Sequence, residues 1–219
     1  MFSIIQAAGW PIWPLLIASV LAIALIIERA LSLKKEKVLP ANLVGEVLQL
    51  HRNKQVTADV LSKLEQNSPL GRILAAGLRN ERASREVMKE SIEEAGRAAA
   101  HQLERFLTSL GTIASTAPLF GLFGTVIGMI EIFGASNPSG ANPQELAHGI
   151  SVALYNTAFG IGVAIPSMIF YRYYRGKVDA LIVAMEQMAV RFVDALHTTP
   201  MPAPAAQSHS PASPKARQR

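Results

Sequence analysis

Apolar and polar residues are arranged along this chain in long blocks, and three of the blocks are apolar. The first, WPIWPLLIASVLAIALIIERALSL, covers residues 10–33. Its unbroken apolar part, residues 12–27, measures about 24 Å as a helix, so the flanking residues are needed to cross a bilayer core of about 30 Å. The other two blocks cover residues 110–134 and 149–171. Each block predicts a transmembrane helix.

The charge-rich sequence between the first two blocks has a helical pattern of its own. NERASREVMKESIEEAGRAAAHQLERFLTSL, residues 80–110, contains good helix formers and no Pro. Its apolar residues recur at helical spacing and predict one long helix that continues into the second block; they are Val87, Ile92, Ala95, Ala99, Leu103 and Phe106. A similar stripe follows the third block, at Val178, Leu181, Ile182, Met185, Met188, Ala189 and Phe192.

Lysine and arginine residues predict how the three helices are oriented. No basic residue precedes Arg29, and the link ASNPSGANPQELAH between the second and third blocks contains none. Basic residues follow the first and third blocks closely, at Lys34, Lys35, Lys37, Arg172, Arg175 and Lys177. Because basic residues favour the cytoplasmic side of a membrane, the N-terminus is predicted outside and the C-terminus inside.

The predicted fold is therefore all-α: a polytopic membrane protein with three transmembrane helices, N-out and C-in. Long helices 2 and 3 extend from the membrane into a cytoplasmic helical bundle. The predicted segments are a periplasmic N-terminus (1–9), transmembrane helix 1 (10–33), a cytoplasmic helical region (34–109), transmembrane helix 2 (110–134), a short periplasmic loop (135–148), transmembrane helix 3 (149–171), a cytoplasmic helical extension (172–197) and a disordered tail rich in Pro, Ala and Ser (198–219).

Composition excludes several classes of function. The chain has no cysteine, its five histidines lie far apart, and it has no nucleophile–base pair or phosphate-binding loop. We expect no enzyme activity, no cofactor and no metal. The net charge of +5 is concentrated beside the apolar blocks and in the tail, which favours contact with membrane lipids and no nucleic-acid role.

Small residues in the second and third blocks predict close helix packing. The candidates are Gly121, Gly124, Gly128, Gly160 and Gly162. These blocks also carry side chains that form hydrogen bonds, namely Thr112, Ser115, Thr116, Thr125, Ser151, Tyr155, Asn156 and Thr157. A Ser or Thr can bond to its own helix backbone, which accounts for any one of them alone. Taken together, they favour a bundle interior or a path that contains water.

Two prolines and one acid complete the candidates in these blocks. Pro118 and Pro166 each remove a backbone hydrogen bond and can free a carbonyl toward such a path. Glu131 is a possible acid of the pathway. Because it lies near the outer end of the second block, a second interpretation is that Glu131 is a solvated carboxylate at the membrane interface.

Two motifs carry a resemblance to a known family. APLFGLFGTVIGMI (117–130) and GISVALYNTAFGIGVAIP (149–166) resemble the MotA/TolQ/ExbB proton channel family, most of all its ExbB/TolQ branch. The resemblance implies a homopentamer around a dimeric, single-span ExbD- or TolR-like partner that supplies a membrane Asp. Thr125 and Thr157 match the two pore-facing threonines of the family. We predict a proton pathway formed by Thr125, Thr157, Ser151, Asn156, Ser115 and Thr116.

The chain departs from the family at one position. Well-known members carry a Glu five residues before the second threonine, and here that position is Val152. One alternative is that the partner's Asp, with Thr125, Thr157 and water, suffices; we favour this one. The other is that Ser151, Asn156 or Glu131 takes over part of the task.

The resemblance implies an ExbB-type subunit in the bacterial inner membrane that uses the proton-motive force and a TonB-like protein to drive outer-membrane uptake. A TolQ-type subunit with a TolA-like protein, serving envelope integrity, is a second interpretation. A scaffold that holds a partner without conduction is a third, and a sodium-driven variant is a fourth.

Overall fold

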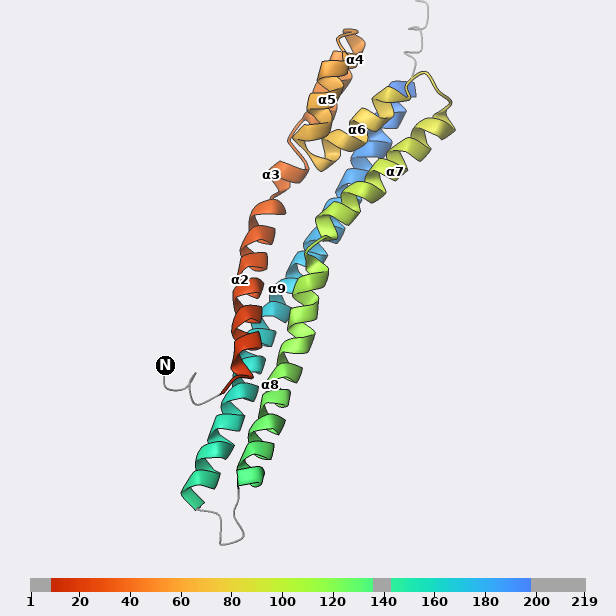
Figure 1. Cartoon of the computed structure of the whole chain (residues 1–219). Helices are drawn as coiled ribbons and strands as arrows, with labels where there is room; N and C mark the ends of the chain where they lie inside the picture. The colour runs from red at the N-terminus through yellow and green to blue at the C-terminus, as the bar shows by residue number, and fades with distance from the viewer. Residues whose placement is uncertain (1–8, 136–142, 198–219) are drawn as a thin grey trace, which may run out of the picture.

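The computed structural model describes residues 9–135 and 143–197, and every regular element in these two ranges is a helix. In Figure 1, α2, α8 and α9 lie side by side as long rods, while the shorter helices gather at one end of them. The all-α class is therefore confirmed for the described residues. The helices are α2 (Ile12–Ser32), α3 (Lys35–Val38), α4 (Leu43–Arg52), α5 (Ala58–Asn67), α6 (Pro69–Arg79), α7 (Arg85–Glu104), α8 (Leu107–Ala135) and α9 (Pro143–His197).

Three helical stretches are long and apolar enough to cross a membrane. They are Ile12–Ser32, Arg85–Gly134 and Gly149–His197. Large apolar side chains on α2, such as Ile17 and Val20, are more than half exposed, as expected of a helix whose outer face meets lipid or another apolar surface. The second and third predicted spans, 110–134 and 149–171, lie within these stretches. The first, 10–33, extends two residues before Ile12 and one residue past Ser32.

Parts of the predicted layout fall outside the described residues. These are residues 1–8 of the predicted N-terminal segment, residues 136–142 of the predicted loop, and the whole of the predicted tail, 198–219. The helix α9 begins at Pro143, earlier than the predicted start of the third span at residue 149. Proline suits the first turn of a helix because its missing N–H has no partner there.

The long helix predicted to lead into the second span is divided in two. α7 ends at Glu104 and α8 begins at Leu107, with Arg105 and Phe106 between them. The carbonyl of Leu103, in the last turn of α7, accepts a hydrogen bond of 3.0 Å from the Arg29 side chain of α2. A side chain from another helix thus satisfies an acceptor at the end of α7.

We call α3–α7 together with residues 172–197 of α9 the head. Its core contains large side chains that are almost fully buried, including Leu70, Leu74, Met88 and Phe192. The apolar stripe predicted on α9 lies in this core. On α7 the pattern differs by one position, because Val87 is 45% exposed while its neighbour Met88 is 1% exposed.

The short helices of the head begin at residues that cap them. The hydroxyl oxygens of Thr57, Ser68 and Ser84 accept hydrogen bonds from the backbone N–H three residues later, at the starts of α5, α6 and α7. Pro69 follows as the first residue of α6. The head is therefore built from helices whose starting points are fixed by local sequence.

Candidate functional site

Glycine residues bring α8 and α9 into close contact. A Cβ atom added at Gly160 would lie 2.6 Å from the carbonyl oxygen of Ala117, and one added at Gly121 would lie 2.8 Å from that of Asn156. No larger residue fits at either position without moving a backbone. A Cβ at Gly128 would make an ordinary contact of 3.4 Å with Ala153, whereas one at Gly162 would meet nothing within 4 Å.

Asn156 lies between the two helices. It is only 1% exposed, and a Cβ added at Gly124 would be 2.9 Å from the Asn156 Cβ and Cγ atoms. Gly124 therefore leaves the room that the amide side chain occupies. Sequence reasoning placed Asn156 among the pathway residues and Gly124 among the packing residues, and the structure brings the two into direct contact.

Most hydroxyl groups of the predicted pathway donate to carbonyls of their own helix. Ser115 and Ser151 are exposed, while Thr116 and Thr125 are half-buried. The acceptors are Thr112 for Ser115 (3.0 Å) and Thr116 (2.8 Å), Leu122 for Thr125 (2.6 Å), and Ala147 for Ser151 (2.9 Å). This bonding satisfies each donor at little cost and leaves the hydroxyl lone pairs free to accept from another group.

Thr157 behaves differently from these four residues. Its Oγ1 atom is buried and has no hydrogen-bond partner in the part of the chain that the structure describes. A buried hydroxyl without a partner is rare in native structures and calls for a ligand, a water molecule or a second chain. Among the described residues, Thr157 is thus a residue of the predicted pathway whose hydroxyl donor is unused.

Three further positions complete the predicted site. Thr125 borders a shallow hollow along α8 that is lined otherwise by Val126, Met129, Ile130, Phe133 and Gly134. Glu131 is exposed near the end of α8 that is remote from α7. Val152 lies on α9, but its side chain is outside the described residues.

A cavity of about 580 Å³ between α2 and α9 was not predicted from the sequence. Apolar side chains line most of it, and Ser19, Tyr155 and Ser167 add hydroxyl groups. The Ser167 hydroxyl is buried and donates to the carbonyl of Val163 at 2.7 Å. Two serines within apolar blocks are the sequence signal that points to this cavity, although their spacing does not reveal which helices enclose it.

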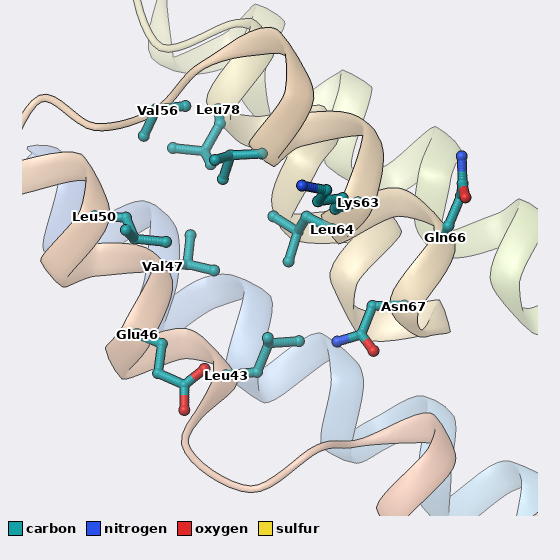
Figure 2. Close-up of a pocket in the computed structure, with 11 residues that line it drawn as sticks. Leu43, Glu46, Val47, Leu50, Val56, Lys63, Leu64, Gln66, Asn67 and Leu78 are labelled. Carbon is teal, nitrogen blue, oxygen red and sulfur yellow. The ribbon is translucent and has the colours of Figure 1, made fainter.

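A second pocket, in the head, has a different character (Figure 2). Its wall is largely aliphatic, with Leu43 and Val47 from α4 and Leu64 from α5, and Glu46 and Lys63 add the charged groups. Among the described residues, no group of three His, Asp or Glu side chains lies close enough to hold a metal ion. The pocket therefore presents a largely apolar surface.

Comparisons with known proteins agree with the paired motifs on α8 and α9. The sequence pattern of the MotA/TolQ/ExbB proton channel family matches residues 65–187. The chain is 36% identical over 175 residues to the ExbB-like 3 biopolymer transport protein of Synechocystis sp., covering 78% of this chain and 82% of the relative. It is 30% identical to the biopolymer transport protein exbB1 of Vibrio cholerae, over 74% of each chain. It is also 38% identical to the Tol-Pal system protein TolQ of Pseudomonas aeruginosa, over 44% of this chain and 42% of that protein.

Proposed function

Because this chain belongs to the MotA/TolQ/ExbB proton channel family, we propose that it is the channel subunit of an ExbB-type motor in the bacterial inner membrane. The motor uses the proton-motive force to drive uptake across the outer membrane. The observation that carries this proposal is the buried, unpartnered Thr157 hydroxyl beside the tight α8–α9 contact. A proton pathway needs such a group, and a helix bundle that only fills space does not.

In the proposed assembly, five copies surround a dimeric ExbD- or TolR-like partner whose single-span helices carry an Asp. A hydroxyl donates to a carboxylate and accepts from a carboxylic acid, so Thr157 serves that Asp in both protonation states. The hydroxyl is buried within its own chain here, and rotation about the Thr157 side chain exchanges it with the methyl group. The Thr125 hydroxyl already donates its proton to the carbonyl oxygen of Leu122, so it can offer only its lone pairs to the Asp.

The chain achieves this without the family Glu. The residue at that position is Val152, so we assign the proton-carrying role to the partner's Asp, with Glu131 of this chain as the alternative acid. A proton that crosses 100 mV yields about 2.3 kcal/mol, so several protons supply enough work to move a TonB-like protein.

A TolQ-type role is the second candidate, because the chain is similar to TolQ proteins as well as to ExbB proteins. Both roles share the channel and differ in the protein that receives the work. A TolA-like protein takes the place of a TonB-like protein in the second role.

The test is purification of the chain in mild detergent after expression with its genomic neighbours, followed by native mass spectrometry. We expect five copies bound to two copies of a single-span protein that bears a membrane Asp. A complex that contains no Asp-bearing partner would contradict the proposal, since the chain would then have no proton carrier. The identity of a third bound protein distinguishes the ExbB-type role from the TolQ-type role.

A further inference from the structure

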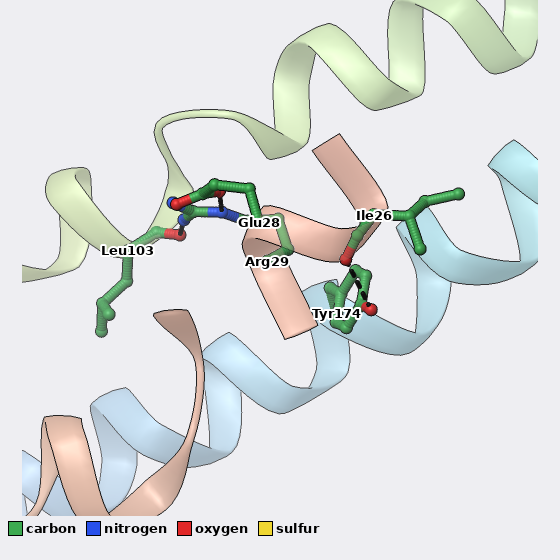
Figure 3. Close-up of polar contacts among 5 residues, drawn as sticks. All are labelled: Ile26, Glu28, Arg29, Leu103 and Tyr174. Atoms are coloured by element: carbon green, nitrogen blue, oxygen red, sulfur yellow. Dashed lines mark hydrogen bonds and ion pairs between the residues drawn. The ribbon is translucent and has the colours of Figure 1, made fainter. Parts of the chain in front are cut away.

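A charged residue is buried where the three longest helices meet the head. Arg29, in the last turn of α2, is 3% exposed. A buried guanidinium is costly unless its N–H groups are bonded and its charge is paired. Figure 3 shows that partners surround it, at the point where α7 gives way to α8.

The guanidinium contacts three groups at once. Its Nε and Nη2 atoms donate to the two carboxylate oxygens of Glu28, at 2.5 and 2.7 Å. Its Nη1 atom donates to the carbonyl oxygen of Leu103 at 3.0 Å. Its Cζ atom lies 5.0 Å from the centre of the Phe106 ring, a cation–π distance. A planar group with several fixed donors suits this combination, whereas a lysine ammonium does not reproduce it.

These contacts lie on both sides of the division between α7 and α8. Leu103 is in the last turn of α7, where carbonyl groups lack helical partners and the helix dipole is negative. Phe106 is one of the two residues between the helices. Arg29 therefore completes the end of α7 and also contacts the residue that precedes α8.

The same end of α2 is joined to α9. The Tyr174 hydroxyl donates to the carbonyl oxygen of Ile26 at 3.0 Å, and Tyr174 is 3% exposed (Figure 3). One turn of α2 thus contacts α7, the α7–α8 junction and α9. These contacts hold the end of α2 against both α9 and the junction that precedes α8.

We propose that Arg29 is a positioning residue that sets the angle between α7 and α8. It thereby holds the helix that carries Ser115, Thr116 and Thr125 relative to the head. The geometric part of this inference is independent of what the chain transports, and its consequence for conduction rests on the proposed function.

Arg105 provides a matched control. Its Cζ atom lies 4.9 Å from the centre of the same Phe106 ring, but its side chain is exposed. The two arginines thus share a stacking partner and differ in burial and in the bond to Leu103. If stacking alone fixed the junction, the two would be equivalent.

The experiment uses the absence of cysteine from the chain. Spin labels at Ala98→Cys on α7 and Thr112→Cys on α8, both exposed, report the distance across the junction by pulsed electron resonance. Labelled chains are diluted with unlabelled ones, so only the distance within one chain is read. We expect the single narrow peak to be kept in Arg105→Met and lost in Arg29→Met.

An unchanged narrow peak in Arg29→Met would overturn the proposal. Where Arg29→Met does not accumulate in the membrane, Arg29→Lys serves in its place, because it keeps the charge and loses the planar fork. We expect a broadened distribution in Arg29→Lys, and a wild-type distribution there overturns the proposal too. Proton flux in the same variants tests the functional part: a broadened distance with unchanged flux excludes a role of the angle in conduction.

Discussion

At the scale of single residues, the hydroxyl groups of α8 and α9 fall into two kinds. Those of Ser115, Thr116, Thr125 and Ser151 donate to a carbonyl of their own helix, so they offer only lone pairs to other groups. The Thr157 hydroxyl has no such bond among the described residues, and its donor is unused. A carboxylate that must be met by a donor therefore has Thr157 as its best partner.

Replacement of Thr157 by Val tests this difference, because Val keeps the shape and removes the hydroxyl. A hydrogen bond to a charged group contributes about 1.5–3 kcal/mol, so we expect proton flux to fall by about tenfold to a hundredfold. Flux is measured in proteoliposomes that contain the chain and its Asp-bearing partner. Thr157→Ser, which retains the hydroxyl, should keep most of the flux.

Thr112→Val is the matched control for that measurement. Thr112 is exposed on α8, and its hydroxyl donates to the carbonyl of Thr108 at 2.9 Å. We expect flux close to that of the parent chain. Equal flux in Thr157→Val and the parent, with normal assembly, would contradict a role of the Thr157 hydroxyl in the pathway.

The contact between Gly124 and Asn156 makes a second prediction at this scale. In Gly124→Ala the new methyl group lies 2.9 Å from the Asn156 side chain, so this side chain or the two helices must shift. Such overpacking costs about 1–3 kcal/mol of stability, measured by thermal unfolding in detergent. Asn156→Ala in the same chain removes the Cγ and Nδ2 atoms and keeps the Cβ atom, so it relieves part of the contact. The double variant should therefore lose less stability than the two single losses add up to.

Gly134→Ala is the control for this pair, because a Cβ there meets nothing within 4 Å. It should not lower the unfolding temperature, since alanine is the better helix former and meets no other atom there. Strict additivity of Gly124→Ala and Asn156→Ala would mean that the two residues do not share a steric contact.

At the scale of elements, the head depends on where its short helices start. The Ser68 hydroxyl accepts from the Gly71 N–H at 3.0 Å in a buried setting, whereas Thr57 accepts from Val60 at 3.4 Å in an exposed one. We expect Ser68→Ala to destabilise the chain by about 0.5–2 kcal/mol, since it leaves a buried N–H without a partner. Thr57→Ala should cost less, because water replaces its hydroxyl. Thermal unfolding followed by circular dichroism measures both, and equal costs would contradict the role of burial.

The elements themselves could be predicted from the sequence where a single physical signal decides them. Apolar length identified the three helices that are long and apolar enough to cross a membrane, and small residues identified positions of the α8–α9 contact. The division at Arg105 and Phe106 could not be predicted, because helix formers run through it. The side chain that bonds to Leu103 there is Arg29, which is 74 residues away in the sequence. The lack of a partner for the Thr157 hydroxyl could not be predicted from the sequence either, since it depends on the side-chain rotamer of Thr157.

At the scale of the whole molecule, the distribution of basic residues argues for one orientation in the membrane. Lys34 and Lys35 follow α2 directly and lead into the head, and Arg175 in the head pairs with Glu104 at 3.0 Å. The link at residues 135–148 has no basic residue. The positive-inside rule then predicts that the head lies in the cytoplasm and this link in the periplasm.

Single cysteines test this orientation, because the chain has none of its own. Ser139→Cys lies in the link by sequence, and Ala98→Cys lies on an exposed face of α7. In spheroplasts, a maleimide that cannot cross membranes should label Ser139→Cys at once and Ala98→Cys only after lysis. The reverse order of labelling would place the head outside the cytoplasm and would contradict the predicted orientation.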